Sequence, residues 1–192
     1  AAIYNANNAM SMLQTAEGAF EEMTNIAYRM KELATQAANG TNNSSEYTAM
    51  NSEFTALRDE MTNIISNTSY GSGTKLLDGT DGKLNASVDF QIGSSAAEVL
   101  SVDISTELGD LDTAMTATEF AAGFDSGVPA TDQADAKTVM GQVDSVINAI
   151  GAARASLGAS MNRLDHTINN VTNMKENTEA AAGQLMDADF AR

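Results

Sequence analysis

Apolar residues recur every three or four positions over three long stretches of the chain. This spacing gathers them on one helix face, so it predicts helices over about 2–39, 44–66 and 131–184. At ~1.5 Å per residue, the third helix would be roughly 75 Å long. A repeat near 3.5 residues sustained over this length favours supercoiled, rod-like packing. The predicted core positions of the third helix are Val143, Ile147, Ile150, Leu157, Met161, Leu164, Ile168 and Val171.

Residue types near the helix ends indicate where each helix begins or stops. The sequence AANG supplies a stop after the first helix, with Gly40 able to adopt positive φ. Ser44 or Ser45 is expected to cap the second helix, and Thr131 the third. At both ends of the chain the helical pattern lacks a cap or a stop. We therefore expect it to continue into further helix in the parent protein.

The middle of the chain has a different period. Apolar and polar residues alternate in KLNASVDFQIG and again in EVLSVDI, which predicts strands. Two Asp-Gly pairs precede them and indicate tight turns, so we expect β-hairpins over about 71–104. The Gly- and Asp-rich segment 105–130 is expected to form a short helix and a loop. The predicted fold is mainly α with a small β region, a rod-like bundle of three long helices plus β-hairpins, and we expect a single domain over 1–192.

The charge and composition exclude several classes of function. The net charge is −16, whereas a nucleic-acid partner requires a basic surface. Such a charge also disfavours an anionic membrane surface, and no apolar run is long enough for membrane insertion. The chain has no Cys and no Trp, so its core must consist of Ala, Leu, Ile, Val and 11 Met. No nucleic acid and no membrane are therefore expected among its partners.

Candidate chemistry is sparse. His166 is the only histidine, and its position on a long helix is typical of a polar surface residue. The segment GSGTK at 71–75 lacks the spacing of a phosphate loop and is interpreted as a turn. The segment DGTDG at 78–82 lacks the alternating carboxylates of a calcium loop. We therefore predict that the chain is not an enzyme and has no catalytic residues, no cofactor and no metal site.

Several longer motifs occur in a fixed order. Residues 6–41 read ANNAMSMLQTAEGAFEEMTNIAYRMKELATQAANGT, residues 156–170 read SLGASMNRLDHTINN, and residues 185–191 read LMDADFA. Over 1–104 and 136–192 the chain resembles bacterial flagellin. The resemblance implies a filament-forming structural subunit whose terminal segments pair as a coiled coil. It also implies that this chain is the helical shaft domain without those segments, and that it is monomeric alone. The outer domains that many flagellins carry would be reduced to about 105–135.

The resemblance also implies a location and partners. Flagellins are exported without a cleaved signal by the flagellar type III apparatus and assemble into the extracellular flagellum, where they serve motility. Expected partners are other flagellin subunits, the hook-associated junction and cap proteins, and an export chaperone. The chaperone site is expected in a C-terminal segment beyond this chain.

A further implied partner is animal Toll-like receptor 5. The receptor-contacting positions of recognised flagellins fall on Arg29, Leu33 and Glu53 of this sequence. Arg29 and Leu33 are four residues apart, which on a helix gives a shared face. The chain departs from the recognised pattern at Tyr28 and Thr35. The same face could instead serve only packing between subunits. The candidates for receptor or filament contact are Arg29, Leu33, Glu53, Tyr28, Lys31 and Leu57.

An alternative hypothesis is a helical surface or sensory interaction domain of a bacterial cell-envelope protein. It accounts for long amphipathic helices and an acidic surface. A chemoreceptor domain would require adjacent transmembrane runs, whereas flagellin requires apolar heptads continuing on both sides.

Overall fold

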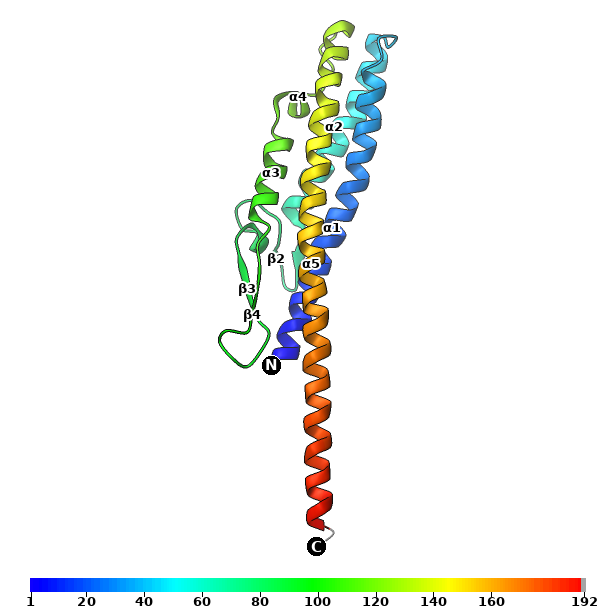
Figure 1. Cartoon of the computed structure of the whole chain (residues 1–192). Helices are drawn as coiled ribbons and strands as arrows, with labels where there is room; N and C mark the ends of the chain where they lie inside the picture. Colours follow the sequence, from blue (N-terminus) through cyan, green and yellow to red (C-terminus); the bar gives the residue numbers. More distant parts are fainter. Residues whose placement is uncertain (191–192) are drawn as a thin grey trace.

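The computed structural model describes residues 1–190, with side chains through residue 186, and shows an elongated helical bundle (Figure 1). Helix α1 (Ala2–Ala37) leads to the far end of the rod, where a turn reverses the chain into α2 (Ser44–Asn67). Helix α5 (Pro129–Phe190) runs antiparallel to α1 and extends beyond it. Its 62 residues correspond to a length of ~93 Å. The predicted mainly-α fold class is confirmed.

The core lies along the interface between α1 and α5. Small residues on α1, such as Ala9, Ala16 and Ala27, are fully buried and let the two helix backbones approach closely. Larger apolar side chains fill the space between them at intervals of three and four residues, as the sequence pattern predicts. On the α5 side the fully or almost fully buried apolar residues are Ala136, Val139, Val143, Val146, Ile150, Ala153, Leu157 and Leu164.

Aromatic packing attaches the outer elements to α2. The ring of Phe54 meets Phe120 edge-on, with ring centroids 5.6 Å apart, and lies 5.2 Å from Phe124. Phe120 belongs to α4 (Thr118–Ala122), which follows α3 (Ser105–Met115) along the bundle. The segment predicted as one short helix and a loop therefore contains two helices, and both pack against α5.

Two small antiparallel sheets lie beside the bundle. Strands β1 (Ser69–Tyr70) and β2 (Thr74–Lys75) form the first. Strands β3 (Val88–Gln91) and β4 (Val99–Val102) form the second, with Val88 opposite Val102. Between them lies a short 3₁₀ helix, η1 (Lys83–Asn85). Leu100 and Val102 of β4 are buried in the core and Ser101 between them is exposed, in keeping with the alternation in the sequence.

One prediction for the β region is confirmed and one detail is wrong. The segment GSGTK, interpreted as a turn, closes the first hairpin, and Gly71 and Gly73 there adopt φ of 63° and 98°. These left-handed conformations are accessible mainly to glycine, which explains the position of the turn. Leu84 belongs to η1 rather than to a strand, because its backbone N–H bonds to the Leu76 carbonyl and its side chain enters the core.

The predicted helix caps also need correction. The N-cap of α2 is Asn43, whose side chain accepts from the Glu46 N–H at 2.9 Å, while the Glu46 carboxylate accepts from the Asn43 N–H. Helix α5 begins at Pro129 rather than at a Thr131 cap, since proline at the first helical position has no N–H to leave unpaired. Gly40 is not in the left-handed region, because α1 already ends at Ala37 with Ala38 in the right-handed region.

None of the helices in the described part of the chain combines the length and apolar character needed to span a bilayer. The end of the LMDADFA motif, Ala191, lies outside the described residues.

Candidate interaction surface

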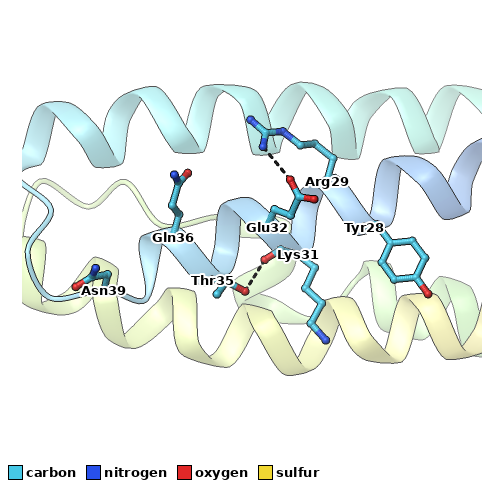
Figure 2. A pocket seen from close by; sticks show the side chains of 7 residues that line it. All are labelled: Tyr28, Arg29, Lys31, Glu32, Thr35, Gln36 and Asn39. Carbon is cyan, nitrogen blue, oxygen red and sulfur yellow. Dashed lines mark hydrogen bonds and ion pairs between the residues drawn. The ribbon is translucent and has the colours of Figure 1, made fainter.

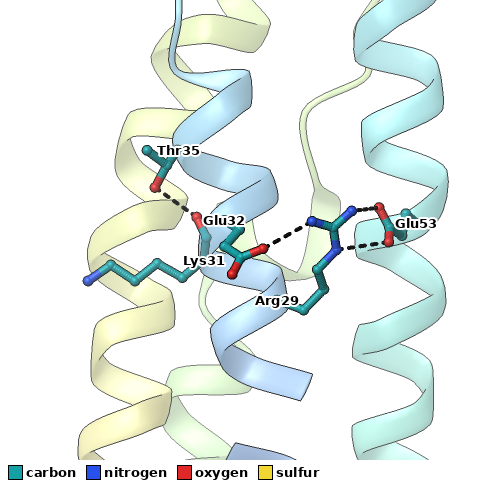
Figure 3. Close-up of polar contacts among 5 residues, drawn as sticks. All are labelled: Arg29, Lys31, Glu32, Thr35 and Glu53. Carbon is teal, nitrogen blue, oxygen red and sulfur yellow. Dashed lines mark hydrogen bonds and ion pairs between the residues drawn. The ribbon is translucent and has the colours of Figure 1, made fainter. Parts of the chain in front are cut away.

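The most developed polar arrangement on the outer face of the bundle is centred on Arg29 of α1 (Figure 3). Its guanidinium binds Glu53 of α2 with two parallel hydrogen bonds, Nε to Oε1 at 3.0 Å and Nη2 to Oε2 at 2.8 Å. Nη1 donates to Glu32 Oε2 at 3.1 Å, one turn along α1. Arg29 is thereby held between two carboxylates from two helices, in the planar geometry that suits a guanidinium.

The electrostatics of Arg29 follow from these contacts. Hydrogen bonds to Glu53 and then Glu32 raise the pKa of Arg29 above its ordinary value. The Arg29 and Glu53 side chains are 46% and 44% exposed, so solvent screens the pair. The arrangement therefore fixes the orientation of the guanidinium more than it stabilises the fold, and almost half of the Arg29 side chain stays accessible to a partner.

Neighbouring side chains extend this arrangement along α1 (Figure 2). Lys31 points away from Arg29 toward α5 and pairs there with Asp144. The Thr35 hydroxyl donates to the Lys31 carbonyl at 2.8 Å, so it is satisfied within its own helix. A shallow surface hollow of about 510 Å³ lies over these residues. It is lined by Tyr28, Arg29, Lys31, Glu32, Thr35, Gln36 and Asn39.

We call these seven residues together with Glu53 the Arg29 surface. Most of its residues lie on α1 and Glu53 lies on α2, while the ion pair from Lys31 to Asp144 links the surface to α5. A shallow, polar surface of this kind suits contact with another macromolecule better than enclosure of a small ligand.

The structure separates the sequence-predicted candidates into exposed and buried ones. Arg29, Lys31 and Glu53 are accessible, and Tyr28 is 53% exposed. Leu33 is only 2% exposed, because the helix turns its side chain into the core. The expectation that Leu33 shares the exposed face of Arg29 is therefore wrong.

Leu57 is half-buried and packs against the core from α2. It can present only part of its side chain to a partner.

The sequence analysis did not identify two of the ion-pair partners at this surface, Glu32 and Asp144. Glu32 was recognisable from its spacing of three residues from Arg29 on a helix. Asp144 was not, since it lies 113 residues from Lys31 in the sequence.

The remaining chemistry is limited. His166 is exposed on α5. Among the described residues, no group of three or more His, Asp or Glu side chains is placed to hold a metal ion. The Arg29 surface contains carboxylates, cations, a phenol and amides, which together provide hydrogen bonds and ion pairs.

Comparisons with known proteins give a consistent result at both ends of the chain. Residues 1–81 match a family described as the bacterial flagellin N-terminal helical region. Residues 140–192 match one described as the bacterial flagellin C-terminal helical region. The N-terminal region therefore precedes the C-terminal region in this chain, as their descriptions require.

Individual proteins agree with the family matches. A flagellin of Bacillus subtilis is 36% identical over 208 residues, covering 98% of this chain and 68% of the relative. A flagellin of Halalkalibacterium halodurans is 34% identical over 189 residues. The match covers 98% of this chain but only 64% of that relative. The crystal structure of a Bacillus cereus flagellin matches with a TM-score of 0.66 and 30% identity, covering 93% of this chain and 94% of that one.

Proposed function

This chain belongs to the bacterial flagellin family, and from this we propose that it is a structural subunit that assembles into an extracellular flagellar filament for motility. The observation that supports this proposal is that the chain matches the flagellin N-terminal region at its start and the flagellin C-terminal region at its end. Flagellins are structural proteins rather than enzymes. Family membership also decides against the alternative of a sensory domain.

The shape of the molecule supports an assembly role. A rod with chemically different faces makes head-to-tail contacts that need not close, and such contacts produce an open helical fibre. The Arg29 surface on α1 and α2 is one candidate contact face for a second copy. Residues 173–186 of α5 form another, because they are exposed and include Met174, Leu185 and Met186, each more than half exposed. Exposed large apolar side chains grouped on one segment are typical of an interaction site.

Electron microscopy tests the proposal. The flagellin containing this sequence would be expressed in a bacterium that lacks its own flagellin, and filaments would be sought by negative staining. We expect filaments and restored swimming. A second copy carrying Met174→Glu and Leu185→Glu should be exported but fail to assemble, whereas Val128→Glu, a similarly exposed apolar residue at the opposite end of α5, should assemble normally. Absence of filaments from the unaltered protein would contradict the proposal.

The finer proposals concern export and partners. We infer export by the flagellar type III apparatus, an export chaperone, and contact with hook-associated junction and cap proteins at the filament ends. Family membership supports each of these. Loss of secretion in a strain without the flagellar export apparatus is the expected result. Secretion that continues in such a strain would exclude this route.

A second candidate function is recognition by Toll-like receptor 5, favoured by the partly exposed Arg29 side chain and its fixed orientation against Glu53. The contact would use Arg29, Glu53 and Tyr28, since Leu33 is buried. The chain as a free monomer would be the form recognised.

Surface plasmon resonance with the receptor ectodomain tests this candidate. Arg29→Ala should weaken binding by about tenfold, as expected for a central arginine at an interface. The matched control is Arg163→Ala, which removes an exposed arginine of α5 away from the Arg29 surface. Equal affinities for both variants would exclude Arg29 as a contact, and absence of binding by the unaltered chain would exclude the function.

A further inference from the structure

The turn between α1 and α2 contains the only Asn-Gly pair of the chain, Asn39-Gly40. Asn39 is exposed, and Gly40 has no side chain to shield its backbone nitrogen. Within residues 1–190, the Gly40 N–H donates to no hydrogen-bond acceptor. The Gly40 N–H is thus not held in a hydrogen bond within the described residues, although the Gln133 side chain lies close to Gly40.

The peptide bond between the two residues is polarised. Asn42 Nδ2 donates to the Asn39 carbonyl oxygen at 2.9 Å and also to the Gln36 carbonyl at 2.7 Å. The Tyr47 hydroxyl donates to the same Asn39 oxygen at 3.3 Å. When the Gly40 nitrogen loses its proton, the negative charge spreads onto that same Asn39 oxygen. Donors already in place stabilise this amidate, so a larger fraction of the Gly40 nitrogen is deprotonated and able to attack.

The electrophile is polarised as well. The Thr41 backbone N–H donates to Asn39 Oδ1 at 3.3 Å, a long but correctly directed contact. If the Gly40 nitrogen adds to Asn39 Cγ, negative charge develops on Oδ1. The Thr41 N–H is then placed as an oxyanion-stabilising donor.

We propose that Asn39 is a site of spontaneous modification, in which the fold of the turn promotes deamidation. The Gly40 nitrogen gives its proton to solvent base and forms a bond to Asn39 Cγ. The bond from Cγ to the side-chain nitrogen then breaks, and that nitrogen takes up a proton from solvent and leaves as ammonia. The resulting succinimide then takes up one water. Opening of the ring at Cγ gives aspartate, and opening at the main-chain carbonyl gives isoaspartate. No oxidant or enzyme is needed, because water is the only other reactant.

The modification changes the end of α1 and the edge of the Arg29 surface. A new carboxylate at position 39 lies beside the carbonyl end of α1, where negative charge is unfavourable. Isoaspartate in addition inserts a methylene into the backbone, which displaces the Asn39 carbonyl from Asn42. Because Asn39 also lines the surface hollow, the same reaction alters a candidate contact face.

Peptide mapping by mass spectrometry tests the proposal. The folded chain would be incubated at neutral pH and sampled over time, and isoaspartate would be counted with a protein isoaspartyl methyltransferase. We expect Asn39 to convert several-fold faster in the folded chain than in a synthetic peptide of residues 34–46. It should also convert before Asn43, which is exposed but has its Oδ1 fixed by the Glu46 N–H. Conversion slower in the folded chain than in the peptide would overturn the proposal.

Two variants distinguish the effect of the folded turn on the deamidation rate from the effect of the Asn-Gly sequence alone. Asn42→Ala removes the shorter of the two hydrogen bonds to the Asn39 carbonyl, leaves that from the Tyr47 hydroxyl, and should slow conversion several-fold toward the peptide rate. Asn63→Ala, an exposed asparagine on α2, should leave the rate unchanged. Circular dichroism would show whether both variants are folded. If Asn42→Ala does not fold, the comparison of the folded chain with the synthetic peptide tests the proposal instead. Unchanged conversion in a folded Asn42→Ala variant would overturn the role of the turn.

Discussion

The guanidinium of Arg154 on α5 donates through Nε to Oε1 of Glu17 on α1 at 2.8 Å. This bond links α5 to α1 through two residues that lie 137 positions apart in the sequence. Their side chains are only 33% and 24% exposed. The other oxygen of Glu17, Oε2, is buried and has no hydrogen-bond partner among the described residues. Arg154 is therefore the group that compensates a largely desolvated carboxylate within the α1–α5 interface.

We predict that Arg154→Ala lowers the free energy of unfolding by about 1–3 kcal/mol, because it leaves Glu17 unpaired where water is partly excluded. Urea denaturation followed by circular dichroism measures this. The control is Lys31→Ala, whose partner Asp144 also lies on α5 but whose ion pair is more exposed. Removing that pair should cost about 1 kcal/mol or less. An equal loss of unfolding free energy in Arg154→Ala and Lys31→Ala would contradict the prediction.

The Phe54 ring gives a second prediction, since it packs against both Phe120 and Phe124 and is fully buried. Phe54→Ala should destabilise the fold by about 3–5 kcal/mol through lost burial and the cavity left behind. Phe54→Leu should cost clearly less, because it refills part of the space. Tyr28→Ala, an aromatic residue exposed on α1, should change stability by about 0.5 kcal/mol at most. Thermal denaturation of the three variants measures the order of their stabilities.

The helices were predictable from the sequence because burial repeats along each of them with a helical period. Phe20, Leu13 and Met23 on α1 lie at such positions, and each is fully buried. The hairpin was less predictable. Asp-Gly pairs and the GSG segment both favour turns, and only the strands that flank them decide which one closes a hairpin.

The candidate surface was predictable only in part. Resemblance to a family places a residue on a helix but does not give its rotation about the helix axis. Leu33 therefore looked like a neighbour of Arg29, although its side chain is in the core. The bond between Arg29 and Glu53 depends on how α2 folds back along α1, and no local pattern encodes the distance between them.

The capping box of α2 gives a third prediction. Asn43→Ala should destabilise the chain by about 0.5–2 kcal/mol, since it frees the Glu46 N–H of its acceptor. Ser44→Ala, the neighbouring residue and the cap expected from sequence, should have a much smaller effect. Urea denaturation compares the two. A larger loss for Ser44→Ala would show that the helix begins one residue later in solution.

The last prediction concerns Asp103, which precedes α3. Its Oδ1 accepts from the Ser105 hydroxyl at 2.6 Å and from the Ser105 N–H at 2.9 Å. These two bonds, the hydroxyl first, lower the pKa of Asp103 below its ordinary value. A carboxyl with a lower pKa in the folded state than in the unfolded state stabilises the fold above the unfolded value of ~3.9. That contribution is lost as the pH falls below ~4 and through the folded pKa.

Removing the hydroxyl tests this assignment directly. Ser105→Ala should raise the pKa of Asp103 toward its ordinary value, as measured by carbon-13 NMR of the side-chain carboxyl during an acid titration. Thr106→Ala, an exposed neighbour on the same helix, should leave that pKa unchanged. Because the Ser105 N–H still donates in the Ser105→Ala variant, the pKa should remain somewhat low rather than return fully. An unchanged Asp103 titration in Ser105→Ala would mean that the hydroxyl does not hold the start of α3 in solution.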